Sequence, residues 1–346
     1  MPLKQKSSPQ SVQAENSYKK LGRWKTILLL VTNVIGFGVL ALPSALGTLG
    51  LVPGIITIVG LGLAATYAAY VLGQFYRCYP AVMNIVDCFP CIISIFTAIL
   101  VLMISIGIEG PSGTLPGRQK EIDIIGNPSY FDGLAACLQI VFAYSGSHGF
   151  VTVMAEMEDV GRDFTPALVI TQSFAVPTYT TVAVVVYILA GKEVRSLALL
   201  NAPHVPSMVA WGALLPCLVA VSIVMGHTAI KYLFILCLRR KEAEEEYSQN
   251  TKRAWALWTS LGVGFWILSF VLANALPNFD AIAALMAALI VSWLSFGFPP
   301  VLWLYLNWAC QFSSGKKMAL AVLNWALIAG TVFASVAGTW AGVKLM

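Results

Sequence analysis

The longest uncharged stretch of the chain sets the strongest limit on its fold. Residues 26–76 contain no Asp, Glu, Lys or Arg. This length suits two membrane-crossing helices of about 20 residues each, joined near Gly47–Pro53. The 346-residue chain is 58% apolar and 11% charged, and further apolar runs lie at about 89–108, 131–155, 164–190, 206–236, 254–276, 281–307 and 318–343. We therefore expect an all-α, polytopic membrane helix bundle with about nine spans.

The distribution of basic residues predicts how these spans are oriented. Residues 1–25 are polar and rich in Ser, Gln and Lys, so we expect a disordered cytoplasmic tail, followed by a transmembrane transporter domain over residues 26–346. With the tail inside, the inner segments hold 16 of the 21 Lys and Arg residues and the outer segments hold five. This bias favours a cytoplasmic N-terminus in a multi-pass protein of the lipid bilayer. The net charge of +5 is then a topology signal, and no nucleic-acid partner is expected.

A glycine-broken segment lies at the centre of the first apolar run, with Gly36 and Gly38 near its midpoint. Unpaired backbone groups have no water to bind in hydrocarbon, so irregular backbone persists there only inside protein or along a polar cavity. A helix that restarts after this break would point free N–H groups at the bilayer centre, where a carboxylate could bind. The alternative is that the glycines only allow close helix packing.

A second polar interruption, Tyr144–Gly149, lies near the midpoint of the apolar run 131–155. The outer half of this run would end near Ala143, with carbonyl groups that suit an ammonium group. The two breaks together would fit a zwitterion. The alternative is that the serines bond back to their own helix and that His148 satisfies a neighbour.

His227 and Lys231 are the candidates for proton coupling. Their i, i+4 spacing puts both on one face of a predicted span. Histidine changes charge near neutral pH, and intramembrane ionisable groups often mark ion pathways. Alternatively, Lys231 could extend its ammonium to the inner membrane surface. No phosphate-binding glycine loop, zinc motif or nucleophile motif is present, so we expect no enzyme activity, metal or cofactor.

Several segments resemble the amino acid/auxin permease family of the amino acid-polyamine-organocation superfamily, and most closely its fungal neutral amino acid permeases. The resemblance is carried by residues 35–44 (IGFGVLALPS), 48–54 (TLGLVPG), 65–67 (ATY), 141–146 (VFAYSG), 162–168 (RDFTPAL) and 226–232 (GHTAIKY).

This resemblance implies a fold of the leucine-transporter type, with eleven helices and two inverted five-helix repeats. It implies proton symport of neutral, aliphatic or aromatic, amino acids across the plasma or vacuolar membrane. The residues that would frame the substrate site are Ile35, Gly36, Phe37, Gly38, Tyr144, Ser145 and Gly146.

The chain departs from the family pattern after its second span. Asp87 and Cys88 are followed at once by a segment similar to the fifth helix of the family, so the third and fourth helices are missing and the inverted repeat is incomplete. The third helix forms a wall of the substrate cavity in such folds. A second hypothesis is therefore a membrane protein that transports nothing: a sensor or a defective, truncated transporter product.

Overall fold

The computed structural model describes residues 21–78, 89–111, 121–192, 194–240, 252–275 and 279–344. Most of the predicted tail, residues 1–20, lies outside this part of the chain. The described elements are helices, apart from one isolated β-bridge between Leu21 and Met157. The expected all-α class is confirmed.

The helices of the first half of the chain include two spans that are interrupted. The first span consists of α2 (Arg23–Val34), the 3-10 segment η1 (Phe37–Ala41) and α3 (Leu42–Leu49). The fourth consists of α6 (Tyr130–Ala143), the 3-10 segment η2 (Ser145–Gly149) and α7 (Phe150–Glu156). The continuous helices are α4 (Leu51–Cys78), α5 (Phe89–Glu109) and α8 (Val160–Ala190).

The second half begins with a short 3-10 segment, η3 (Ala198–Asn201), which leads into the long helix α9 (His204–Arg240). The remaining elements are α10 (Lys252–Ala275), α11 (Phe279–Met286), the π-helical segments η5 (Ala287–Val291) and η6 (Trp293–Gly297), α12 (Phe298–Asn307), η7 (Trp308–Cys310) and α13 (Gly315–Lys344).

The lengths of these helices suit a polytopic membrane protein. Within the described ranges, seven helices are long and apolar enough to cross a membrane, with the first interrupted span counted as one. Two shorter apolar helices, Thr97–Ile108 and Tyr130–Ala143, lie where the sequence predicts two more spans. The total of nine spans stays a prediction.

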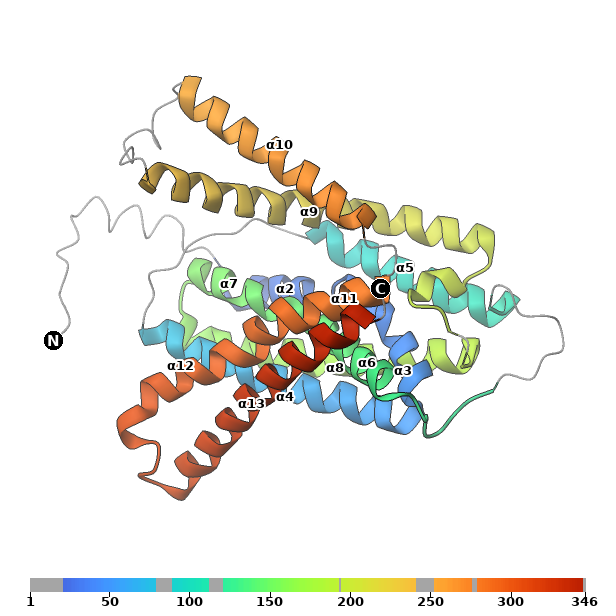
Figure 1. Cartoon of the computed structure of the whole chain (residues 1–346), viewed down its shortest axis with the longest axis horizontal. Coiled ribbons are helices and arrows are strands. Elements are labelled where there is room, and N and C mark those ends of the chain that lie inside the picture. The colour runs from blue at the N-terminus through green and yellow to red at the C-terminus, as the bar shows by residue number, and fades with distance from the viewer. Residues whose placement is uncertain are drawn as a thin grey trace.

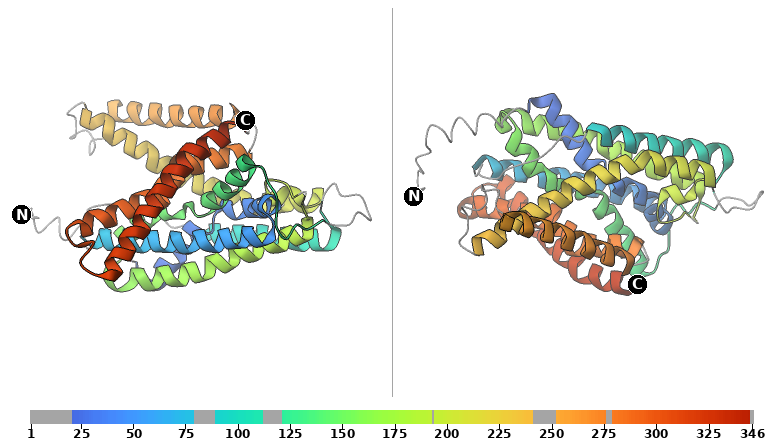
Figure 2. Two further views of the ribbon diagram at one scale, coloured as in Figure 1. Left: turned by 60° about the horizontal axis from the view of Figure 1, so that its bottom comes forward. Right: turned by 90° about the horizontal axis from the view of Figure 1, so that it is seen from above.

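Helix α9 and helix α10 lie together along one side of the bundle (Figure 1). Helix α9 packs along α5, whereas α10 packs mainly on α9, and the most apolar window of α10 has no buried residue. Helix α8 packs on both α2 and α4 (Figure 2), and 76% of the apolar window of the first interrupted span is buried. The interrupted spans therefore lie inside the bundle, and α10 faces the outside.

The predicted inner ends of the interrupted spans are tied together. The guanidinium of Arg23 pairs with the carboxylate of Asp163 at 2.7 Å, and the side chain of Asp163 is only 4% exposed. The backbone N–H of Glu158 donates to the carbonyl of Leu21 at 3.2 Å. These contacts fix the chain at the N-terminal end of α2. The helix begins at Arg23, three residues before the predicted start of the transmembrane domain.

Candidate functional site

The first break of helical backbone lies where the sequence places it. Helix α2 ends at Val34, Ile35 and Gly36 are irregular, and a 3-10 turn begins at Phe37. The N–H of Val39 donates to the carbonyl of Gly36 at 3.3 Å, which closes the new turn. Ile35 is buried and Gly36 is partly exposed; the side chain of Phe37 lies outside the described part.

The second break also coincides with its predicted position. Helix α6 ends at Ala143, Tyr144 is a turn residue, and η2 covers Ser145–Gly149 before α7 restarts. Tyr144 and Gly146 are buried, whereas Ser145 is half-buried.

The two breaks touch each other through glycines. A Cβ added to Gly38 would lie 2.6 Å from the Cα of Ala143, and one added to Gly146 would collide with the backbone of Asn33. Real Cβ atoms do not approach other atoms this closely. Gly38 therefore lies in an interrupted span and also permits close packing, as the packing alternative predicts, whereas a carboxylate site at this break stays a prediction.

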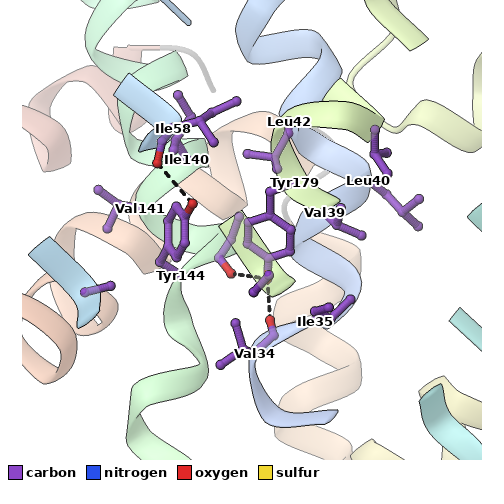
Figure 3. Close-up of a cluster of buried hydrophobic side chains, with 14 of the residues drawn as sticks. Val34, Ile35, Val39, Leu40, Leu42, Ile58, Ile140, Val141, Tyr144 and Tyr179 are labelled. Carbon is purple, nitrogen blue, oxygen red and sulfur yellow. Dashed lines mark hydrogen bonds between the residues drawn. The ribbon is translucent and has the colours of Figure 1, made fainter. Parts of the chain in front are cut away.

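Tyr179 of α8 joins the backbone of both interrupted spans (Figure 3). Its fully buried hydroxyl lies within hydrogen-bonding distance of the Val34 carbonyl and 3.0 Å from the Ala143 carbonyl. A hydroxyl carries a single proton, so it donates to one of the two carbonyls at a time. The Ala143 carbonyl, at the helix end predicted to face an ammonium group, thus shares this hydroxyl with the Val34 carbonyl, which also accepts from the N–H of Gly36 at 2.9 Å.

Two further side chains hold the second break in place. The hydroxyl of Tyr144 donates to the carbonyl of Ile58 in α4 at 3.0 Å (Figure 3). The hydroxyl of Ser295, in the π-helical segment η6, donates to the Tyr144 carbonyl at 3.4 Å. The span that contains η5 and η6 therefore contacts the break through an irregular helix, and π-helical turns occur often at functional sites.

The proposed coupling residues lie away from these breaks. His227 is exposed on α9, and its ring is 5.3 Å from the ring of Trp258 in α10. Lys231 is half-buried one turn further along α9. Since α9 packs mainly on α5 and α10, the structure does not bring either residue to the two interrupted spans.

A cavity of about 620 Å³ lies near the predicted outer ends of the interrupted spans. Its lining includes Thr48, Asp123, Asn127, Asp132, Gln139 and Lys192. The ammonium of Lys192 lies 2.8 Å from the Asp123 carboxylate, and this hydrogen bond raises the pKa of Lys192 above its usual value. Among the described residues, no group of three His, Cys, Asp or Glu side chains could hold a metal ion.

Comparison with known proteins agrees with this helical architecture. The family described as transmembrane amino acid transporter protein matches residues 19–85 and 89–344. The chain belongs to this transporter family. The family match points to a transporter, and the apolar helices fit a multi-pass membrane protein.

Three fungal proteins are similar to this family member. The "N amino acid transport system protein" of Neurospora crassa is 25% identical over 398 residues, covering 91% of this chain and 83% of that protein. Proteins called "Transmembrane transporter" from Fusarium pseudograminearum and Gibberella moniliformis are 26% and 27% identical over 181 residues, covering 52% of this chain and 37% of each relative.

The alignments also show a difference in length. The family match is interrupted between residues 85 and 89. The Neurospora alignment spans 398 positions but uses only 91% of the 346 residues of this chain, or about 315. About 80 positions of the Neurospora protein therefore have no counterpart in this chain. Two membrane helices with their loops would account for a gap of this size.

Proposed function

We propose that this chain is a secondary active transporter that imports neutral amino acids, aliphatic or aromatic, by proton symport. The observation that carries the proposal is the single Tyr179 hydroxyl shared by the carbonyls of Val34 and Ala143. An amino acid ammonium has three N–H donors and could satisfy both carbonyls at once. Substrate binding would then replace a donor that serves only one carbonyl at a time.

The backbone near the breaks would supply the remaining recognition. Gly38 and Gly146 let the backbones of the two spans touch, whereas a Cβ added to Gly36 would have no neighbour within 4 Å, so the main chain at Gly36 would stay within reach of a small solute. The positive end of the helix dipole after the first break would favour a carboxylate. Ile35, Phe37, Tyr144 and Ser145 would shape the space for the substrate side chain.

Proton coupling would act at a distance from the substrate. His227 and Lys231 remain our candidates, and their protonation would act through the packing of α9 on its neighbours, α5 and α10. Coupling over such a distance requires a structural element that can adopt two arrangements. Both the proton site and the substrate site must favour one of these arrangements over the other.

Uptake of a radiolabelled neutral amino acid by a transport-deficient host tests the proposal. We expect uptake above background that is lost in Gly38→Leu, because the new side chain would collide with Ala143. The matched control is Gly60→Leu, whose added Cβ has no neighbour within 4 Å. Uptake that survives Gly38→Leu would contradict the proposed site.

The second candidate function is a membrane protein that does not transport, either a sensor or a defective, truncated product. It is favoured by the interruption of the family match between residues 85 and 89. Full surface expression without uptake of any neutral amino acid would support it. Restored uptake after grafting the unmatched segment of the Neurospora protein at Asp87–Phe89 would assign the defect to the missing helices.

A further inference from the structure

The cavity of about 620 Å³, which we call the outer cavity, adjoins both interrupted spans at their predicted outer side. Gln139 lines it and lies five positions before Tyr144, which is about 7 Å along the helix at 1.5 Å per residue. The hydroxyl of Ser44, three residues beyond η1, donates to the side-chain oxygen of Gln139 at 3.0 Å. Gln139 therefore links the wall of the cavity to Ser44 of the first interrupted span, and Gly47 and Thr48 of the same span also line the cavity.

Groups of opposite charge line the same cavity. Asp132 is exposed and accepts a hydrogen bond from the hydroxyl of Ser129 at 2.6 Å. A carboxylate has about four lone-pair positions, so Asp132 keeps acceptor capacity after this bond. Lys192 supplies an ammonium that is half-exposed and paired with Asp123.

We propose that the outer cavity is a binding site for a zwitterionic amino acid, occupied before the solute reaches the interrupted spans. The substrate ammonium would bind Asp132, and its carboxylate would share Lys192 with Asp123. The identity of the ligand rests on the proposed function, whereas binding in the outer cavity needs no transport.

The charges of the lining disfavour a simple anion. Two carboxylates and one ammonium leave a formal charge of −1, so a free anion is repelled. A solute that carries both charges can use Asp132 and Lys192 together. Ala135, Ala136 and Gly47 add small apolar surface, which leaves space for the side chain of the solute.

Equilibrium binding of tritiated L-phenylalanine to the purified full chain in lipid nanodiscs tests this inference. We expect Asp132→Asn and Lys192→Gln each to weaken binding in the outer cavity about tenfold, as for a lost charge-assisted contact. The matched control is Asp159→Asn, an exposed carboxylate that caps α8 and does not line the cavity. The inference would be overturned if both variants bound the ligand with the same affinity as the control. It would also be overturned if the wild type did not bind the ligand.

The variant Gly38→Leu separates this inference from the proposed transport site. Saturable binding that persists in Gly38→Leu and is weakened by adding Asp132→Asn supports the outer cavity, even if the wild type shows no uptake and the proposed function fails. Complete loss of binding in a Gly38→Leu protein that still elutes as a folded species would overturn the outer cavity and leave the breaks as the binding site.

Discussion

The hydroxyl oxygen of Tyr179 lies 3.0 Å from the carbonyl oxygen of Ala143, although the residues belong to different spans. This bond satisfies a carbonyl at the point where α6 ends, and the same hydroxyl also reaches Val34 in the other interrupted span. One side chain from a continuous helix thus connects both breaks.

Replacing Tyr179 with Phe should destabilise the empty protein and strengthen substrate binding. The change removes the hydroxyl donor near the buried Ala143 carbonyl, whereas the Val34 carbonyl keeps the N–H of Gly36 at 2.9 Å, and the lost donor costs about 1–3 kcal/mol. A bound ammonium would restore the lost bonds, so ligand should raise the Tm of Tyr179→Phe more than that of the wild type. Thermal unfolding in detergent, with and without amino acid, measures both effects. Tyr70→Phe, at an exposed position of α4, is the control, and an equal Tm for both variants would refute the role of the hydroxyl.

Breaking the Arg23–Asp163 pair should loosen the predicted inner end of the bundle. Asp163 is nearly buried and is also 3.2 Å from the Nε of Arg162, so Arg23→Gln leaves it one partner. Asp163→Asn removes both attractions and should lower the Tm more than Arg23→Gln does. Arg162→Gln, at a side chain that is 72% exposed, should change the Tm least. Any other order in thermal unfolding would contradict this assignment.

Ser295→Ala should affect substrate use more than stability. The bond from Ser295 to the Tyr144 carbonyl is long at 3.4 Å, so its loss should cost less than about 1 kcal/mol of unfolding free energy. The Tyr144 peptide would be held less firmly, and we expect the half-saturation concentration of uptake to rise about two- to fivefold. Ser292→Ala is the control because its hydroxyl donates to Ala288 of its own helix. Equal uptake constants for the two variants would argue against a role for Ser295.

The proposed coupling residues predict a change in pH dependence. If protonation of His227 drives coupling, uptake should rise at acidic pH in the wild type and become flat in His227→Gln. Uptake measured from about pH 5 to 8 spans the charge change of histidine. A parallel variant, Trp258→Leu, keeps the histidine but removes its ring neighbour and should keep the slope. An unchanged pH profile in His227→Gln would remove His227 from the mechanism.

Local signals in the sequence were enough to locate both breaks. Glycine and polar residues at the middle of an apolar run predicted the irregular backbone at Gly36 and Tyr144. The mismatch between such residues and a continuous membrane helix depends only on nearby residues, so it can be read from the sequence. The sequence allowed the alternative that Gly38 permits close packing, but it could not identify Ala143 as the residue that Gly38 contacts.

The residues that bridge the breaks could not be predicted in the same way. Tyr179 lies in an ordinary apolar helix, and its partners are 36 and 145 positions away in the sequence. A weak signal near Ser295 could have been used: Pro299 lacks an N–H and cannot donate the usual helical hydrogen bond at this point of the span. That signal favours an irregular helix here but does not identify Tyr144 as the neighbour.

The tie between Leu21 and the segment after α7 has a mechanical consequence. The backbone bond from Glu158 and the Arg23–Asp163 pair fasten the beginning of α2 to the chain that follows the second interrupted span. Beyond the other end of α2, Gly38 and Gly146 bring the backbones of the two spans into direct contact. Helices α2 and α7 are therefore connected at both of their ends, so a tilt of either helix about its break would also move the other.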